Sequence, residues 1–559
     1  MLNNVLKNLS LKFQKLTSDK NIRDISLICI VYTFCYGLSL LNTGLYWDDW
    51  IWFSGAMDHY LRDSFFLQIG NPVGIYYWNF FELFPNFIQI NRLFIFLYFL
   101  GAGLLLNNIL KNIRHIDDAS RLIIVLLFVS LPVNGARIVL STSTYSFSYL
   151  LFFLGLWLIG LSYLKQNFML KILAMICFFI SFFTNSFLPF YAIVFLYLFY
   201  LEYNLYFSIK NVFNIIRKNI DLLLLPIIFW IVKTIYFKPF GAYQGYNEIT
   251  YMNFINFPFS VIILIKNNVY AFIMSILLSQ ISFLFLIIFF VLISFLIYRR
   301  FCPKNNLSTI NNTQISCNIP DFRLNLIFFI VGCFFLLLAI FPYALTGHLL
   351  SNGWNSRNQL LLPLGLSFCL YFGSKLIFLK VNTSLCKKMF ILASILTFCV
   401  LLNFSTNLDL QKYWYKESSI STNIKDSEII KSHTSFIFED NAILVGSHSY
   451  WGGGYGYTSM MASNFKDQTR WGLAVSAYDP EAIWWRKDYI FNANDFILKK
   501  PEYLIKINYG DSSYSNEYKL MYLEIFNKPE FQKRIKDYVK FEYIPISTIN
   551  NNISTYNHN

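Results

Sequence analysis

The stretch ISLICIVYTFCYGLSLLNTGLYWDDWIW (residues 25–52) joins an uncharged apolar run to a group of aromatic and acidic residues. Its first part, Ile25–Thr43, is long enough to cross a hydrocarbon core of roughly 30 Å as a helix. Apolar runs of this kind recur as far as Leu402. The pattern predicts an all-α polytopic membrane protein.

Composition supports this prediction, because 56% of the 559 residues are hydrophobic and only 14% are charged. A soluble protein of this kind would expose too much apolar surface. Hydropathy and bounding charges predict about eleven transmembrane helices. We place them at residues 25–43, 92–110, 121–138, 146–163, 170–184, 186–203, 221–237, 277–298, 325–343, 358–377 and 389–405. Residues 255–276 are interrupted by polar side chains, and we expect an interfacial or re-entrant helix there.

The distribution of basic residues predicts a cytoplasmic N-terminus. In this orientation the cytoplasmic segments carry 21 Lys and Arg, and the external segments with the outer span ends carry seven. Cytoplasmic loops of membrane proteins show such an excess. The net charge of +14 therefore follows from membrane orientation, and we expect no nucleic-acid partner.

Two regions differ in composition. Residues 1–408 form the expected transmembrane domain, in which the first outer loop, 44–91, mixes aromatic and charged residues as interfacial helices do. Residues 409–559 have the composition of a soluble domain, which we expect outside the cytoplasm. None of the nine cysteines lies in this tail, so no disulfide framework is expected there.

The tail carries patterns of both strands and helices, so we predict a C-terminal soluble α/β domain. Residues 442–446, 503–507 and 541–546 are expected strands. Leu520–Val539 is an expected helix with apolar residues spaced among charges. The glycine-rich stretch Trp451–Tyr457 lacks the spacing of a nucleotide-binding loop and favours a hairpin or a glycan-contacting loop.

Asp48 and Asp49 are the candidate catalytic residues. Carboxylates at a membrane surface are unfavourable unless they serve chemistry or binding. Trp47 and Trp50 offer apolar faces on which a sugar can stack, and partial burial between them would make a carboxylate a better base. The alternative interpretation is that the acids begin an interfacial helix, where the helix dipole favours negative charge.

Basic residues near the outer ends of later spans are candidates for binding a phosphate. Arg357 opens a span from the outer side, and an anionic ligand would stabilise it there by bidentate hydrogen bonding. His348 in the same loop could assist it. Lys233 and Lys238 could add charge to this site, or they could anchor the seventh span in the interface.

A divalent cation is a further candidate ligand. Asp48, Asp49, Glu82 and an outer-loop carbonyl could supply the oxygen atoms that Mg²⁺ or Mn²⁺ prefers, although nothing in the sequence requires a metal. Glu82 is also a candidate for contacting the substrate, and the alternative is that it belongs to a solvated helix face.

The acidic pair after the first span resembles the motif of the GT-C class of polyprenyl-phosphate-sugar glycosyltransferases. The many spans, the first-loop interfacial helices and the C-terminal outer domain are also similar to that class. The resemblance implies that Asp48-Asp49 positions or deprotonates the acceptor. It also implies that Arg357 holds the donor phosphate.

We therefore expect a glycosyltransferase in a bacterial inner membrane. It would transfer a sugar from a polyprenyl-phosphate-linked donor to a glycan or glycolipid acceptor, such as a lipopolysaccharide or another cell-envelope polysaccharide, on the outer face. The expected partners are this donor, the acceptor and membrane lipids. Two alternatives are a polysaccharide polymerase or ligase, and a flippase or transporter of lipid-linked glycans.

Overall fold

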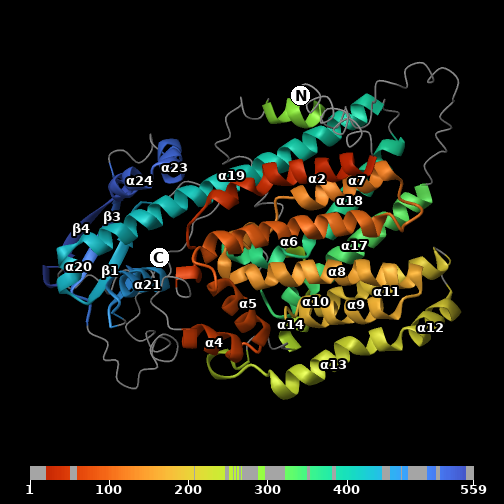
Figure 1. Ribbon diagram of the computed structural model, residues 1–559, viewed down its shortest axis with the longest axis horizontal. Coiled ribbons are helices and arrows are strands. Elements are labelled where there is room, and N and C mark those ends of the chain that lie inside the picture. The colour runs from red at the N-terminus through yellow and green to blue at the C-terminus, as the bar shows by residue number, and fades with distance from the viewer. Residues whose placement is uncertain are drawn as a thin grey trace, which may run out of the picture.

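The protein is predominantly helical, with a small sheet domain at one end of a helical bundle (Figure 1). The computed structural model describes residues 20–50, 59–204, 206, 208–245, 251–255, 257–259, 261–263, 266, 288–295, 322–348, 353–380, 385–442, 454–467, 469–475, 500–510 and 517–548. The expected association of a helical membrane region with a small α/β tail agrees with this arrangement.

Among the described residues, five helices are long and apolar enough to cross a membrane. They are α2 with the following 3-10 turn η1 (Lys20–Leu41), α6 (Phe87–Leu110), η3 with α8 (Leu140–Lys165), α17 (Phe322–Leu345) and the segment Phe390–Asp426 of α19. A sixth candidate is the pair η6 (Gly353–Gln359) and α18 (Leu362–Lys380), which is bent by 73°. These helices are compatible with an integral membrane protein.

The expected count of about eleven spans is not reached by these helices. Several expected spans coincide with helices of only 12 to 17 residues, whereas a span needs about 20. These are α7 (Asp118–Ser130), α9 (Phe168–Ser181), α11 (Ala192–Tyr203, preceded by α10 at Phe187–Phe190) and α13 (Ile220–Tyr236). The proline at 132 explains the end of α7, because the residue before a proline is pushed out of the helical conformation. Most of 277–298, and much of 255–276, lies outside the described residues.

The first outer loop contains two short helices, as expected. They are α4 (His59–Gln68) and α5 (Pro72–Glu82), and they are joined through Gly70, whose φ of +69° lies in the left-handed region that favours glycine. A side chain at this position would also collide with the carbonyl oxygen of Phe237. Trp78 of α5 is fully buried and anchors the pair against the bundle. Their place in the membrane interface stays a prediction.

A single helix of 42 residues, α19 (Leu385–Asp426), connects the bundle to the tail (Figure 1). The expected domain boundary at residues 408 and 409 lies inside it. Beyond that point, Ile420 and Ile424 of α19 are fully buried in one core with the sheet residues Phe436 and Ile505. The tail is therefore built around the end of a helix that begins in the bundle.

The tail sheet has four strands in the order β2-β1-β3-β4. The strands are β1 (Ser435–Asp440), β2 (Trp471–Ala474), β3 (Tyr503–Tyr509) and β4 (Val539–Pro545). Strand β1 pairs in parallel with β2 and β3, and β3 pairs antiparallel with β4. Helices α20 (Glu428–Ser432), α21 (Gly454–Phe465), α23 (Glu517–Phe526) and α24 (Lys528–Ile535) complete the domain.

Two expected strands of the tail, 503–507 and 541–546, are confirmed by β3 and β4. The single helix expected at Leu520–Val539 is wrong. It is broken at Asn527, whose side chain caps α24 by accepting a hydrogen bond from Glu530 N (3.3 Å), and a proline follows in the first turn of α24. The strand expected at 442–446 lies largely outside the described residues, and β1 lies just before it.

The expected glycine-rich loop also differs where it is described. Residues 451–453 lie outside the described residues, and Gly454 begins the helix α21. Tyr457 is buried and its ring stacks on Phe438 at 4.3 Å between centroids. Tyr457 is therefore a core residue and does not offer a surface to a glycan.

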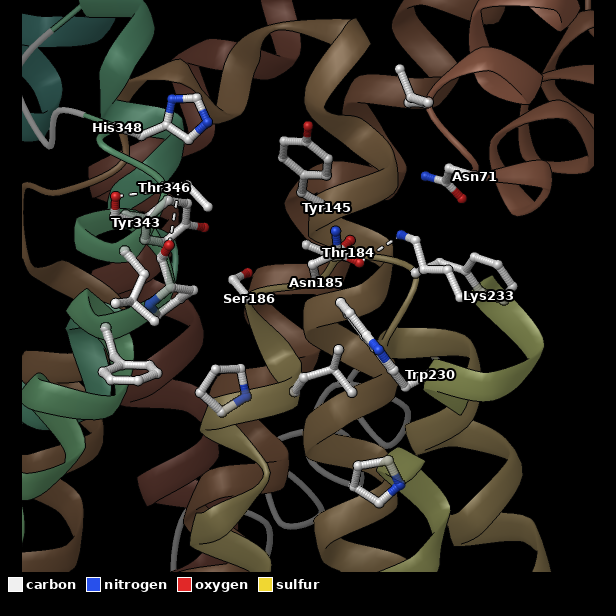
Figure 2. Close-up of a pocket in the computed structure, with 18 of the residues that line it drawn as sticks. Asn71, Tyr145, Thr184, Asn185, Ser186, Trp230, Lys233, Tyr343, Thr346 and His348 are labelled. Carbon is white, nitrogen blue, oxygen red and sulfur yellow. Dashed lines mark hydrogen bonds between the residues drawn. The ribbon is translucent and has the colours of Figure 1, made fainter. Parts of the chain in front are cut away.

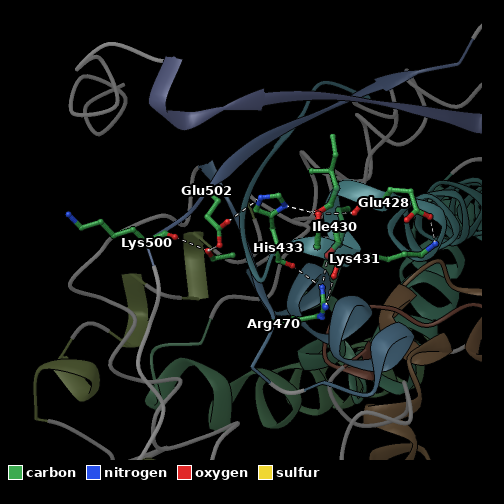
Figure 3. A network of polar contacts seen from close by, with 10 residues as sticks. Glu428, Ile430, Lys431, His433, Arg470, Lys500 and Glu502 are labelled. Carbon is green, nitrogen blue, oxygen red and sulfur yellow. Dashed lines mark hydrogen bonds and ion pairs between the residues drawn. The ribbon is translucent and has the colours of Figure 1, made fainter.

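Arg470 joins α20 to the sheet (Figure 3). Its guanidinium donates to the backbone carbonyls of Ile430, Lys431 and His433, which satisfies acceptors left over at the end of a short helix. His433 in turn lies 3.5 Å from a carboxylate oxygen of Glu502, at the edge of β3. These contacts fix α20 and the following residue, His433, on the sheet.

The shared core makes a stability prediction. Replacing Ile420 by Ala should lower the free energy of unfolding by about 2–5 kcal/mol, because it opens a cavity between α19 and the sheet. The exposed Lys425→Ala on the same helix is the matched control and should have little effect. Denaturant unfolding of the detergent-solubilised protein, followed by tryptophan fluorescence, measures both. Equal stabilities of the two variants would contradict a shared core.

Candidate functional site

The loop that carries the two acids is fixed by Asp49. Its carboxylate is completely buried and accepts hydrogen bonds from three backbone amides. The donors are Leu140 N (3.0 Å), Ser141 N (2.8 Å) and Tyr46 N (3.3 Å). Two of these amides belong to η3 (Leu140–Thr142), at the start of the helix α8. Asp49 therefore holds its own loop against the beginning of a bundle helix.

This environment suits a structural carboxylate better than a base. Burial raises the pKa of Asp49 to about 7, although the amides of Ser141 and Leu140 and the charge of Arg92 oppose that rise. With both oxygens engaged by backbone donors, Asp49 has no exposed atom to offer a substrate. We therefore interpret Asp49 as the residue that positions Asp48.

Arg92 of α6 stabilises the preceding part of the loop. The guanidinium is buried and donates one hydrogen bond to the carbonyl of Asn42 and another to the carbonyl of Gly44. It also lies close enough to Asp49 to interact with it electrostatically. Arg92 thus holds the loop before Asp48, and Asp49 holds it directly after Asp48.

Trp47 connects this loop to the second candidate segment. Its backbone φ of +48° is unusual for a bulky residue, and its ring lies 5.4 Å from that of Trp354 in η6. The guanidinium of Arg357 in turn lies 4.0 Å from the centroid of Trp354. A cation over an indole ring is attracted by the ring's negative face. The two candidate segments, about 300 residues apart in the sequence, are therefore neighbours in space.

Two further hydrogen bonds dock η6 on the bundle. Ser356 Oγ accepts from the amide of Ala136 (2.8 Å), and Gln359 Oε1 accepts from the amide of Asn134 (3.1 Å). Ala136 belongs to η2 (Gly135–Ile138), which directly precedes the amides that bind Asp49. The segment 134–141 thus supports both the acidic loop, through the amides of Leu140 and Ser141, and the arginine segment, through the amides of Asn134 and Ala136.

Asp48 is the acid that interacts electrostatically with Arg357. It is partly buried, and the loss of hydration raises its pKa, while the positive charge of Arg357 lowers it. Among the described residues, Arg357 Nη1 is buried and has no hydrogen-bond partner. A buried guanidinium nitrogen without a partner is unfavourable, and an anionic ligand would satisfy it.

Arg357 borders a cavity of about 570 Å³ that also contains Lys233 and His348 (Figure 2). Lys233 Nζ donates to Asn185 Oδ1 at 2.7 Å, and burial lowers the pKa of His348 with a further contribution from Arg357. His348 therefore favours its neutral form. The rest of the wall is mostly apolar and includes Ile227, Trp230, Ile231, Phe341 and Pro342.

The cavity is therefore amphipathic. Figure 2 shows His348, Tyr145 and Asn71 at one end and Trp230 toward the other, with Asn185 and Lys233 between them. A site with a few polar groups and a largely apolar wall is typical of small-molecule and cofactor pockets. Its dimensions and chemistry suit a molecule with an anionic group joined to an apolar chain.

The structure brings together part of the predicted set of site residues. Arg357, His348 and Lys233 line one cavity. Trp47 lies against Trp354 of the same segment as Arg357, and Asp48 interacts electrostatically with Arg357. Of the other four, Asp49 has the structural place described above, and the remaining three residues are placed as follows.

Lys238 is exposed and does not line the cavity. Trp50 is buried, with its ring 6.3 Å from that of Trp414 on α19, so it packs between the loop and the helix. Glu82 of α5 forms an ion pair with the buried Arg62. Trp50 and Glu82 therefore have structural contacts that the sequence pattern did not distinguish from a site.

A metal does not fit the residues suggested for it. Asp49 already accepts three amide hydrogen bonds and Glu82 pairs with Arg62. In the part of the chain that the structure describes, no three His, Cys, Asp or Glu side chains are grouped to hold a metal ion. No role for a divalent cation is assigned to these carboxylates.

The cavity also contains polar residues that sequence reasoning missed. Asn185 and Ser186 lie at the short break between two apolar runs, and Tyr145 and Asn71 come from α8 and the α4–α5 turn. The only sequence signal was the polar triplet 184–186, which interrupts a long apolar stretch and could have been recognised as a lining segment.

Comparison with known proteins adds no assignment. No protein-family model matches this chain, and no curated protein matches it. The interpretation of the site therefore depends on its own geometry.

The different roles of the two acids predict different stabilities. Asp49→Ala should lower the free energy of unfolding by about 1.5–3 kcal/mol, because hydrogen bonds to a charged group are lost and buried amides are left without an acceptor. Asp48→Ala, the matched control one residue away, should have a much smaller effect. Thermal unfolding in detergent measures both variants, and a larger effect at Asp48 would contradict the assignment.

Proposed function

We propose that the protein is an integral membrane glycosyltransferase that uses a polyprenyl-phosphate-linked sugar. It would transfer the sugar to a glycan or glycolipid acceptor on the extracytoplasmic face. One observation carries the proposal: a cavity with an apolar wall contains two cationic side chains, one of which, Arg357, interacts electrostatically with the partly buried carboxylate of Asp48. The resemblance of Asp48-Asp49 to the GT-C motif supports the same conclusion.

The donor would be bound through its phosphate and its lipid chain. Arg357 offers a buried nitrogen that lacks a partner among the described residues, and guanidinium groups bind phosphate with two parallel hydrogen bonds. Lys233 would add a second positive charge. The isoprenoid chain would lie along the apolar wall near Trp230 and Ile231.

The reaction would be a single displacement at the anomeric carbon. Asp48 accepts the proton of the acceptor hydroxyl, and the oxygen of that hydroxyl forms the new glycosidic bond with the anomeric carbon. The bond between the anomeric carbon and the phosphate oxygen breaks, and the electron pair leaves with the lipid phosphate. Arg357 and Lys233 would stabilise the negative charge that develops there. Attack from the opposite face inverts the anomeric configuration.

The finer topology is part of the proposal. We infer about eleven spans, a cytoplasmic N-terminus, and a tail on the extracytoplasmic side of a bacterial inner membrane. The excess of basic residues in the segments assigned to the cytoplasm supports this orientation. The acidic loop and the cavity would then be at the outer leaflet, where a translocated lipid-linked sugar is presented.

Lys233 and Lys238 form a matched pair for testing the donor site. Lys233→Gln should reduce transfer from a polyprenyl-phosphate-linked sugar by roughly tenfold or more at subsaturating donor, the effect expected for a lost hydrogen bond to a charged group. Lys238→Gln removes an exposed lysine outside the cavity and should stay within about twofold. Product formed in detergent, without a sealed membrane, also separates a transferase from a flippase. Equal activities of the two variants would contradict the donor site.

The pH dependence tests Asp48. The base acts only when ionised, and burial raises its pKa above 3.8, so activity should decline on acidification at a higher pH than for a hydrated aspartate. The charge of Arg357 opposes this rise in the pKa of Asp48. In Arg357→Gln, the loss of activity on acidification, the acidic limb of the pH profile, should therefore occur at a higher pH, even at saturating donor. Asp48→Asn should abolish transfer. A limb that stays in place in Arg357→Gln would exclude Asp48 as the titrating base.

A further inference from the structure

The tail domain contributes one buried carboxylate to the support of the acidic loop. Glu524 of α23 is only 7% exposed. It accepts hydrogen bonds from Thr43 Oγ1 (2.7 Å) in the loop and from Gln411 Nε2 (2.6 Å), Tyr415 OH (3.1 Å) and Trp414 Nε1 (3.3 Å) of α19. A single side chain of the tail therefore connects the loop to the long helix.

The loop is held from its other side by the bundle. Arg92 binds the carbonyls of Asn42 and Gly44, the two residues that flank Thr43. The side-chain amide of Asn42 also donates to Gln411 Oε1 (2.6 Å) and to the hydroxyl of Tyr46 (2.6 Å). Residues 42–44 thus lie between an arginine of the bundle and a glutamate of the tail.

The packing leaves little room for movement at this point. A Cβ atom on Gly44 would lie 2.7 Å from the ring of Trp414, so the backbone of the loop passes directly against α19. The hydroxyl of Tyr46 donates to the carbonyl of Leu410 on the same helix (2.9 Å). Loss of the hydrogen bond at Thr43 would therefore loosen the packing of residues 42–46 against α19.

Arg92 lies close enough to both Asp49 and Glu524 to interact with them electrostatically. Burying a carboxylate is unfavourable unless several donors and a nearby positive charge compensate for it. Glu524 accepts hydrogen bonds from four side chains, and both Glu524 and Asp49 interact electrostatically with Arg92. Arg92 of the bundle, Asp49 of the loop and Glu524 of the tail therefore form one charge cluster. This cluster favours a single arrangement of the bundle, the loop and the tail relative to one another.

From these contacts we infer that Glu524 is a positioning residue, through which the tail domain holds the loop that carries Asp48. The catalytic meaning of this inference rests on the proposed function, whereas the mechanical coupling does not. The tail would then be required for the geometry of the site even though none of its described residues lines the cavity.

Hydrogen exchange of the full-length protein tests the coupling. In Glu524→Gln, the amides of residues 44–50 should exchange about tenfold faster or more, the ratio that corresponds to roughly 1.4 kcal/mol of lost stability. Glu530→Gln is the matched control, because Glu530 pairs with Arg534 on the exposed surface of α24. Its loop exchange should equal that of the wild type.

Kinetics add a readout that general destabilisation would not produce. Glu524→Gln should lower kcat by about tenfold while KM for the donor stays within about twofold, because the cavity is untouched. Exchange and kcat both equal to the wild type would overturn the inference. If the wild type itself transfers no sugar, the proposed function fails, and the exchange result still decides the coupling.

A second variant covers the case in which Glu524→Gln prevents folding of the tail. Thr43→Val removes only the hydroxyl that the loop offers to Glu524 and leaves the tail unchanged. Faster exchange at residues 44–50 is again expected, with normal exchange in β1 and β3. Unchanged loop exchange in Thr43→Val would overturn the inference.

Discussion

A buried carboxylate bound by three backbone amides is the constraint on which the site depends. Asp49 joins residues 46–49 to the start of α8, and this fixes the direction in which the neighbouring Asp48 leaves the backbone. The same bundle segment supports η6 through Ser356, so the arginine is placed by the structure that places the acid. Backbone amides are rigid donors, and their geometry is independent of side-chain rotamers. The relative position of Asp48 and Arg357 is thus determined by main-chain packing.

The cavity has the physical character of a site for an amphipathic anion. Lys233 and Arg357 are positive charges at a wall that is otherwise mostly apolar, and such charges are unfavourable until a ligand neutralises them. A neutral sugar would leave both charges uncompensated, whereas a lipid phosphate would satisfy the charges and the apolar wall together. This preference favours a lipid-linked donor, and Arg357 of the same cavity interacts electrostatically with Asp48.

The sequence was sufficient to predict apolar membrane-type helices and a small α/β tail, and it singled out Lys233, His348 and Arg357, which line one cavity. These three residues could be singled out because each stands near the end of an apolar run, where a basic side chain is unexpected. The sequence could not distinguish the roles of Asp48 and Asp49, because adjacent acids have the same neighbouring residues. Their difference depends on the distant amides of residues 140 and 141, which donate to Asp49. It also could not show that Glu524 reaches Thr43, because that contact depends on a tail packed around α19. Asn527 and the proline in the first turn of α24 are sequence signals for the start of a new helix. The apolar spacing across 520–539 had instead suggested one continuous helix.

The most direct test is a structure determined in lipid nanodiscs with a saturating polyprenyl phosphate. The account predicts density for the phosphate within hydrogen-bonding distance of Lys233 and Arg357, with the chain along Trp230 and the acidic loop unchanged. A phosphate bound on another face of the molecule, with the cavity filled by packed side chains or ordinary lipid, would contradict it.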